Sequence, residues 1–220
     1  MDKKSLHDKR EEFLKQQKEA DERKRYHRTQ YPDEYITGRK YDPKTKDKVE
    51  SMPLYYHTGD MDRYLKAHKT AQQFGGPKLT PEQLTAMALV EGREDFGYNT
   101  WDTSNPKVAK HYMNLVKNGM DPQDAGFAAA IYEKDLVAKR LKIPFETAWN
   151  GTGTSIWNKS GKNYADTVNK TKEVVKHPKN ESLYNFIKQR ASYEDDMPNV
   201  AVADTVEMPS DYSDGNWKLI

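Results

Sequence analysis

The chain has 220 residues, of which 35% are apolar and 32% are charged. This supply of apolar side chains is thin, so we expect one compact core with solvated extensions and not two full domains. The formal net charge of +2 gives no overall attraction to nucleic acid, and the absence of cysteine excludes disulfides and thiolate metal sites. No apolar run approaches the roughly 20 residues that span a bilayer. We expect no signal peptide, because no apolar stretch follows the N-terminal lysines.

Residues 1–30 carry 17 charged side chains of both signs. Leu6, Phe13 and Ala20 are spaced by seven residues, but the second heptad position is polar, so a stable coiled coil is not expected. We predict a charged helical arm that orders on a partner, with a disordered tail as the alternative.

Residues 31–79 are rich in tyrosine and turn residues, with no long periodic segment before Asp60. Asp60 is the predicted N-cap of a short helix, and the sequence Gly75-Gly76-Pro77 predicts its end. The apolar face of this helix has four members at helical spacing: Met61, Tyr64, Leu65 and His68.

Residues 80–190 are predicted to form a mainly α domain. Thr80-Pro81-Glu82-Gln83 is a capping box, and it begins a helix whose apolar face is Leu84, Met87 and Ala88. Similar signals predict helices at 106–118, 122–140, 145–150, about 162–175 and 180–191, the last one capped by Asn180. No strand is predicted here, and the acidic segment 191–220 is predicted to be an extended tail.

Glu91 is the candidate catalytic residue. It lies seven residues after Leu84, on the same helical face. A carboxylate on an apolar face is costly to bury in its ionised form, and a protonated carboxyl is what a general acid needs. Because Gly92 is expected to end the helix, Glu91 should project beside a cleft. The alternative is a helix-terminal glutamate paired with Arg93 or Arg140.

Two later motifs extend this interpretation. They are Ala148-Trp149-Asn150-Gly151-Thr152-Gly153 and Tyr164-Ala165-Asp166-Thr167-Val168. With Glu91 before them, these two motifs follow an order along the chain that resembles that of the lysozyme-like lytic transglycosylases. In that family a helix ends in the catalytic Glu, an Ala-Tyr-Asn-x-Gly motif lines the sugar cleft, and a helix with a Tyr-Val-x-x-Val-like pattern follows. The resemblance runs from about Thr80 to Val168.

The resemblance implies a lysozyme-like helical domain with Glu91 as the acid/base. It implies that Asn150 and Gly151 line the cleft, that Trp149 stacks on a sugar ring and that Tyr164 supports the cleft from the next helix. The chain departs from the family at three places. Gly92 replaces a Ser, Trp149 replaces a Tyr, and the Gly-Leu-Met-Gln motif is not recognisable between Asp95 and Pro106.

The implied substrate is the glycan strand of bacterial peptidoglycan, cleaved by a transglycosylase or a muramidase-like hydrolase. A hydrolase needs a second carboxylate, for which Glu94, Asp95 and Asp102 are the nearby candidates. The implied setting is a bacteriophage virion protein that acts at the bacterial cell wall.

A structural virion protein that keeps the scaffold without activity is the alternative. The arm and residues 193–220 would then bind other virion proteins. Nucleic-acid packing is disfavoured, because seven acidic residues interrupt the basic residues of the arm. No metal or nucleotide cofactor is expected, since His57, His68 and His111 lack ligand spacing and no phosphate-binding glycine loop is present.

Overall fold

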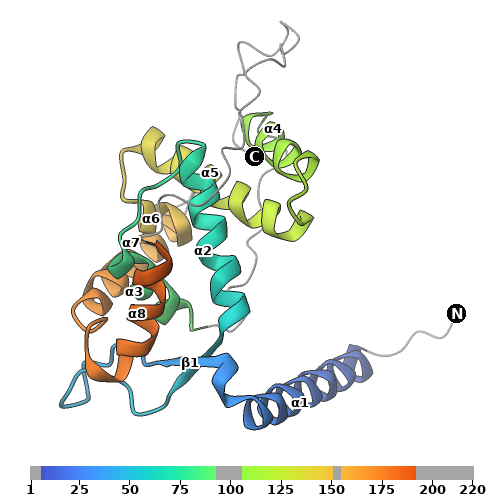
Figure 1. The fold of residues 1–220 in the computed structure, drawn as a ribbon, viewed down its shortest axis with the longest axis vertical. Helices are drawn as coiled ribbons and strands as arrows, with labels where there is room; N and C mark the ends of the chain where they lie inside the picture. The colour runs from blue at the N-terminus through green and yellow to red at the C-terminus, as the bar shows by residue number, and fades with distance from the viewer. Residues whose placement is uncertain (1–5, 93–105, 151–154, 192–220) are drawn as a thin grey trace, which may run out of the picture.

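The computed structural model describes residues 6–92, 106–150 and 155–191 (Figure 1). This part of the chain is mainly helical, as predicted, with eight α-helices and one two-stranded sheet. The helices are α1 (Leu6–Gln30), α2 (Thr58–Gln73), α3 (Pro81–Glu91), α4 (Pro106–Lys117), α5 (Pro122–Leu141), α6 (Phe145–Asn150), α7 (Ser155–Lys172) and α8 (Glu181–Ala191). The strands are β1 (Tyr35–Gly38) and β2 (Leu54–His57), and two 3-10 turns are η1 (Pro32–Glu34) and η2 (Pro178–Asn180). Within the described residues, every helix is too short or too polar to cross a membrane.

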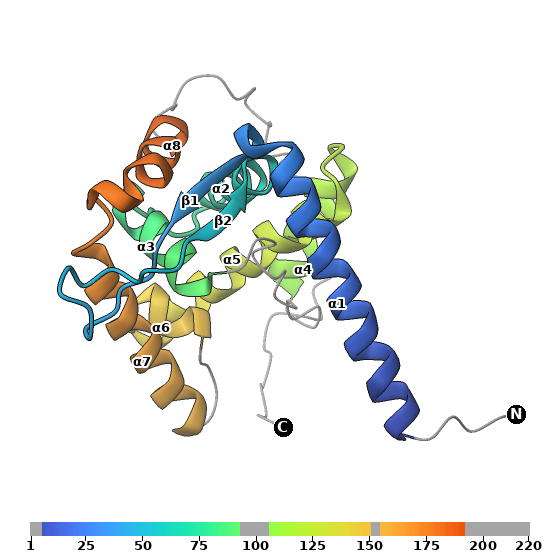
Figure 2. The ribbon, with the colours of Figure 1, turned by 90° about the horizontal axis from the view of Figure 1, so that it is seen from below.

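Helix α1 forms the charged segment at the start of the chain and projects away from the other helices (Figures 1 and 2). From Asp8 onward its side chains are exposed, apart from half-buried Ala20 and Arg28. Its C-terminal end is attached to the sheet, where His27 Nδ1 is hydrogen-bonded to the Tyr35 hydroxyl at 2.9 Å. Nearby, the Arg28 guanidinium lies 4.1 Å from the centre of the Tyr55 ring.

Strands β1 and β2 pair in antiparallel fashion, with Ile36 opposite Tyr56. The sequence did not predict them, because each has four residues and shows too little alternation. Long-range packing holds them instead. The buried Tyr56 hydroxyl donates to the carbonyl of Ala88 in α3 at 3.0 Å. Gly38 allows β1 to approach α3, since a Cβ atom there would lie 2.7 Å from Leu89 Cδ2.

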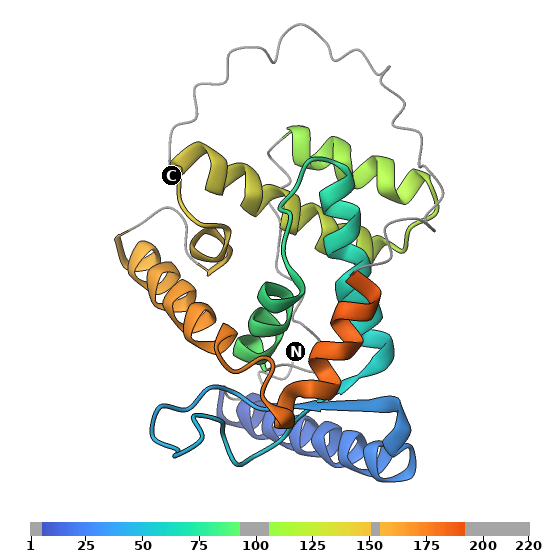
Figure 3. The ribbon, with the colours of Figure 1, turned by 60° about the vertical axis from the view of Figure 1, so that its left-hand side comes forward.

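Helix α3 lies at the centre of the body, between α7 and α8 (Figure 3). The predicted capping box is present, with the Thr80 hydroxyl accepting from the Gln83 N–H at 3.2 Å and Gln83 Oε1 accepting from the Thr80 N–H at 3.0 Å. The prediction that only one face of this helix is buried is wrong, because all six residues from 84 to 89 are buried. A helix that is apolar on all sides belongs inside a core.

The predicted helices at 106–118, 122–140 and 145–150 are confirmed as α4, α5 and α6. Helix α7 begins at Ser155, earlier than predicted, and ends at Lys172. The predicted N-cap of α2 is wrong: the helix begins at Thr58, and His57 Nδ1 accepts from the Gly59 N–H at 3.2 Å.

Asn180 does not act as the predicted cap of α8. It is fully buried in η2, and its side chain makes three hydrogen bonds, two of them long-range. Its Oδ1 accepts from the Arg39 N–H at 2.6 Å, and its Nδ2 donates to the carbonyls of Arg39 and Val174. Asn180 therefore fastens the loop after β1 to the start of α8. The predicted tail lies outside the described residues.

Candidate active site

Glu91 is the last residue of α3, and its side chain is half-buried. Gly92 ends the helix in the left-handed conformation (φ 60°), and its N–H donates to the Ala88 carbonyl at 2.9 Å. A Cβ atom on Gly92 would lie 2.5 Å from Lys40 Cε. Glycine at this position is therefore explained by its positive φ and by this neighbour.

Trp149 contacts the Glu91 carboxylate directly. Its indole N–H donates to Glu91 Oε1 at 3.1 Å, so the carboxylate is oriented by a residue of α6. The indole ring is 6% exposed and lies among three rings, with centroid distances of 5.7–6.4 Å: Phe145, Phe127 and His68. The resemblance implied that this ring stacks on a sugar. With so little exposed surface, the ring is poorly suited to that role. It is suited to hold Glu91 through its N–H.

Tyr164 lies on α7 with its hydroxyl close to Glu91. The side chain is 7% exposed, and the hydroxyl makes no hydrogen bond of normal geometry within the described residues. Burial, and next the negative charge of Glu91, raise the pKa of Tyr164 well above its usual value. The same two causes raise the pKa of Tyr64, whose hydroxyl donates to the Leu84 carbonyl at 3.2 Å. Both phenols therefore stay protonated beside the carboxylate at any physiological pH.

We call Glu91, Trp149, Tyr164 and Tyr64 the Glu91 cluster. Two of its members, Trp149 and Tyr164, come from α6 and α7, which pack very closely (Figures 1 and 2). At the closest point, a Cβ atom on Gly161 would lie 2.3 Å from the Thr147 carbonyl oxygen. Gly161 precedes Tyr164 by one helical turn, so the glycine contact sets how near Tyr164 comes to Trp149 and Glu91.

Glu146 is a buried acid that the sequence did not single out. It is 6% exposed, its Oε1 accepts from Gln83 Nε2 at 3.0 Å, and Lys172 Nζ lies 3.7 Å away. The carboxylate thus links α3, α6 and α7. Its charge also contributes to the raised pKa of Tyr164. Its position three residues before Trp149, on the same helical face, is the signal that sequence reasoning missed.

Two other sequence-predicted residues that the structure describes, Asn150 and Arg140, do not join the cluster. Asn150 is the last residue of α6 and its side chain is exposed. Arg140 is exposed on α5, and among the described residues no ion pair involves Glu91. Five predicted residues fall outside the described residues: Gly151, Arg93, Glu94, Asp95 and Asp102.

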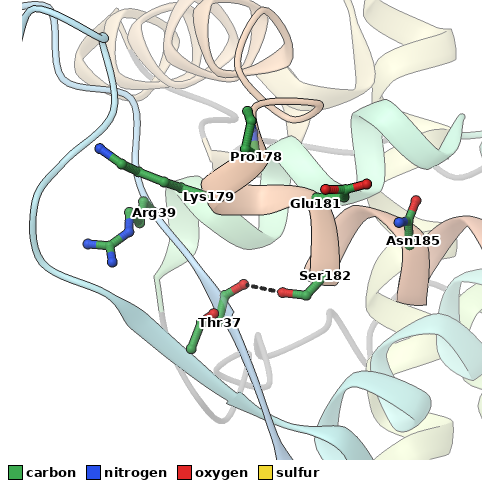
Figure 4. A pocket seen from close by; sticks show the side chains of 7 residues that line it. All are labelled: Thr37, Arg39, Pro178, Lys179, Glu181, Ser182 and Asn185. Carbon is green, nitrogen blue, oxygen red and sulfur yellow. Dashed lines mark hydrogen bonds between the residues drawn. The ribbon is translucent and has the colours of Figure 1, made fainter.

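A pocket of about 450 Å³ lies elsewhere, between β1, η2 and α8 (Figure 4). Its cations are already engaged: Lys179 pairs with Asp47, and the Arg39 guanidinium donates to the Ser51 carbonyl. It contains no member of the Glu91 cluster. The described residues also hold no group of three or more His, Asp or Glu side chains arranged for a metal ion.

The geometry therefore singles out the Glu91 cluster, which combines one half-buried carboxylate with an indole donor and two uncharged phenols. Such an arrangement fits proton transfer by a single carboxyl group. Comparison of the chain with protein-family models, with curated protein sequences and with solved structures gives no match.

Proposed function

We propose that this protein cleaves the glycan strand of bacterial peptidoglycan as a lytic transglycosylase with a lysozyme-like helical domain. The observation that carries the proposal is the hydrogen bond from Trp149 to Glu91, two residues 58 positions apart in the chain. The motifs that suggested each residue are independent of one another in the sequence. Their meeting at the end of one helix, with Tyr164 beside them, supports a shared role at one site.

Glu91 acts first as an acid and then as a base. The protonated carboxyl donates its proton to the glycosidic oxygen, and the bond between that oxygen and the sugar C1 breaks. The carboxylate then takes the proton of the same sugar's 6-hydroxyl, whose oxygen attacks C1 and closes an anhydro ring. No water is consumed. The Trp149 N–H holds Oε1 throughout and leaves Oε2 for the substrate.

Tyr164 supports the ionised intermediate form of Glu91. Because burial keeps its phenol protonated, it adds a dipole but no negative charge beside the carboxylate. Orientated dipoles in a site of low polarity stabilise a charge that forms during the reaction.

Among the acids that the structure describes near the cluster, the state of Glu146 supports a one-carboxylate mechanism over hydrolysis. That second acid is buried and already bonded to Gln83 and Lys172, so it is poorly placed to activate a water molecule. We therefore expect anhydro ends and not reducing ends in the product.

A structural role in a phage particle is the second candidate, and α1 favours it. This 25-residue helix is exposed over nearly its whole length and is suited to bind a neighbouring virion protein. The two roles are compatible if a virion protein opens the cell wall during infection.

The test compares wild type and Glu91→Gln on purified peptidoglycan, by loss of turbidity and by zymogram. Glu91→Gln should lower the cleavage rate at least about 100-fold, the effect of removing a general acid. Glu173→Gln, on an exposed residue just after α7, is the matched control and should retain full activity. Mass spectrometry of the products should find anhydro ends. Equal activity of wild type and Glu91→Gln would remove Glu91 from the mechanism. If wild type is inactive and deletion of residues 1–30 abolishes assembly, only the structural role remains.

A further inference from the structure

Glu146 connects the first turn of α6 to the first turn of α3. It is 6% exposed, and its Oε1 accepts from Gln83 Nε2 at 3.0 Å. Gln83 is itself fixed, because its Oε1 accepts from the Thr80 N–H at 3.0 Å in the capping box of α3. With its oxygen engaged in this way, the Gln83 amide has one orientation, in which the NH₂ group donates to Glu146.

A second hydrogen bond connects α6 to the other end of α3. The Trp149 N–H donates to Glu91 Oε1 at 3.1 Å, and Glu91 is the last residue of α3. Trp149 follows Glu146 by three residues, so both side chains leave the same side of α6. The six-residue α6 is thus bound to the beginning and to the end of α3, and a shift of one bond along α3 would strain the other.

Helix α7 packs on both α3 and α6 (Figure 2). The Nζ atom of Lys172, its last residue, lies 3.7 Å from the same Glu146 oxygen that Gln83 binds. The charges of Glu91 and Glu146 both contribute to the raised pKa of Tyr164, another residue of α7. Glu146 therefore lies close enough to the Glu91 cluster to affect its geometry.

We propose that Glu146 is a positioning residue, whose bond to Gln83 sets the position of α6 along α3 and thereby the bond from Trp149 to Glu91. The effect of Glu146 on cleavage rests on the proposed function, whereas its effect on the Trp149 bond does not. Buried ionic groups contribute little to stability, and their best-attested role is to fix the register of packed helices.

The test follows the Trp149 indole N–H in the nitrogen–proton NMR spectrum of the full-length protein. Trp149→Phe removes this signal and so assigns it. Glu91→Gln should move it, because the acceptor of the hydrogen bond changes. A hydrogen bond to a carboxylate shifts the indole proton downfield and slows its exchange with solvent.

Gln83→Glu keeps an oxygen for the capping box but replaces the donor to Glu146 by a second acid. The Trp149 signal should then move upfield, and its proton should exchange about tenfold faster, the effect of weakening one hydrogen bond. The double variant with Gln83→Glu and Glu146→Gln exchanges donor and acceptor and leaves an amide oxygen for Lys172. The Trp149 signal should return to its original position, with exchange within about twofold of wild type, and the cleavage rate should follow the same order.

Asp135→Asn is the matched control. Asp135 is 5% exposed, and its ion pair with Lys139, at 2.6 Å, stays within α5. This variant therefore removes the charge of another buried acid without changing a bond between α3 and α6. The Trp149 signal should stay in place while the thermal midpoint falls.

A Trp149 signal that Gln83→Glu leaves unchanged would overturn the inference, as would a double variant that differs from wild type as much as Gln83→Glu does. An equal change in Asp135→Asn would overturn it as well, because the signal would then report a general loss of stability. If Gln83→Glu does not fold, the double variant decides. A wild-type signal in the double variant supports the inference, and a shifted signal or failure to fold overturns it.

These outcomes are separate from those of the proposed function. A Trp149 signal that follows the pair, in a protein that does not cleave peptidoglycan, supports the positioning role and rejects the enzyme. Cleavage that depends on Glu91, with a Trp149 signal that does not respond to the pair, rejects the positioning role alone. A signal that Glu91→Gln does not move contradicts the Trp149 bond, on which both proposals depend.

Discussion

Substitution of Gly161 by Ala tests whether the close packing of α6 on α7 builds the site. Helix propensity alone favours Ala over Gly by about 1 kcal/mol. Packing acts in the opposite direction, because the new methyl group would lie 2.3 Å from the Thr147 carbonyl oxygen. That oxygen belongs to the backbone of α6 and cannot rotate away as a flexible side chain would.

The size of the effect follows from the distance. Ordinary contact for a Cβ atom begins near 3.4 Å, so α7 must move from α6 by about 1 Å. Overpacking of this kind costs about 1–3 kcal/mol, which offsets or exceeds the gain in helix propensity. The net loss of stability should be about 1 kcal/mol. Because a misplacement of about 1 Å at a reacting group lowers rates about 100-fold, activity should suffer far more than stability.

Urea unfolding and peptidoglycan cleavage measure the two effects separately. Asn169→Ala is the control, since Asn169 is exposed on the same helix and gains propensity without a clash. It should be as stable as wild type or slightly more stable, with unchanged activity. The reasoning fails if Gly161→Ala matches Asn169→Ala in both stability and activity.

Two further predictions follow from the site and the core. Trp149→Phe keeps an aromatic ring but removes the donor to Glu91, so the cleavage rate should fall about tenfold; an unchanged rate would mean that the hydrogen bond does not serve catalysis. The smaller ring leaves space in a buried site, so the thermal midpoint should fall as well. Burial lowers the pKa of His68 to about 3 and that of His111 to about 4, against about 6.5 in an unfolded chain. The unfolded state therefore binds more protons below pH 6.5, and the free energy of unfolding should fall with decreasing pH by about 1.4 kcal/mol per pH unit for each histidine. His68→Phe should remove one of these two contributions in urea unfolding between pH 7 and 5, and equal slopes in variant and wild type would contradict the assignment.

Much of the helical framework could be predicted because helix ends are encoded locally. The capping box at Thr80 and the cap at Asp121, whose carboxylate accepts from the Gln123 and Asp124 N–H groups, need only the next few residues. The strands could not be predicted in this way. Tyr56 is held by a carbonyl 32 positions later, and Asn180 binds a residue 141 positions away, so neither role leaves a local pattern.

In the candidate site, too, some features could be predicted from local sequence and others depend on long-range packing. Glu91 was suggested by its helical spacing, and Trp149 and Tyr164 were suggested by motif order. The use of the indole N–H as a donor, in contrast, depends on how α6 meets the end of α3. The position of Glu146 depends on packing between segments far apart in the chain. These contacts follow from tertiary structure, and a single sequence does not encode them in any short window.

The burial of the middle of α3 has a consequence for how the proposed activity would be lost. Amide groups of a helix whose six middle residues are buried should exchange with solvent only through global unfolding. The carboxylate of Glu91 is thus attached to the most protected part of the chain, while the exposed α1 can fray without disturbing it. Heat or denaturant should therefore switch off the reaction in the same cooperative transition that melts the core, with no earlier inactive but folded stage.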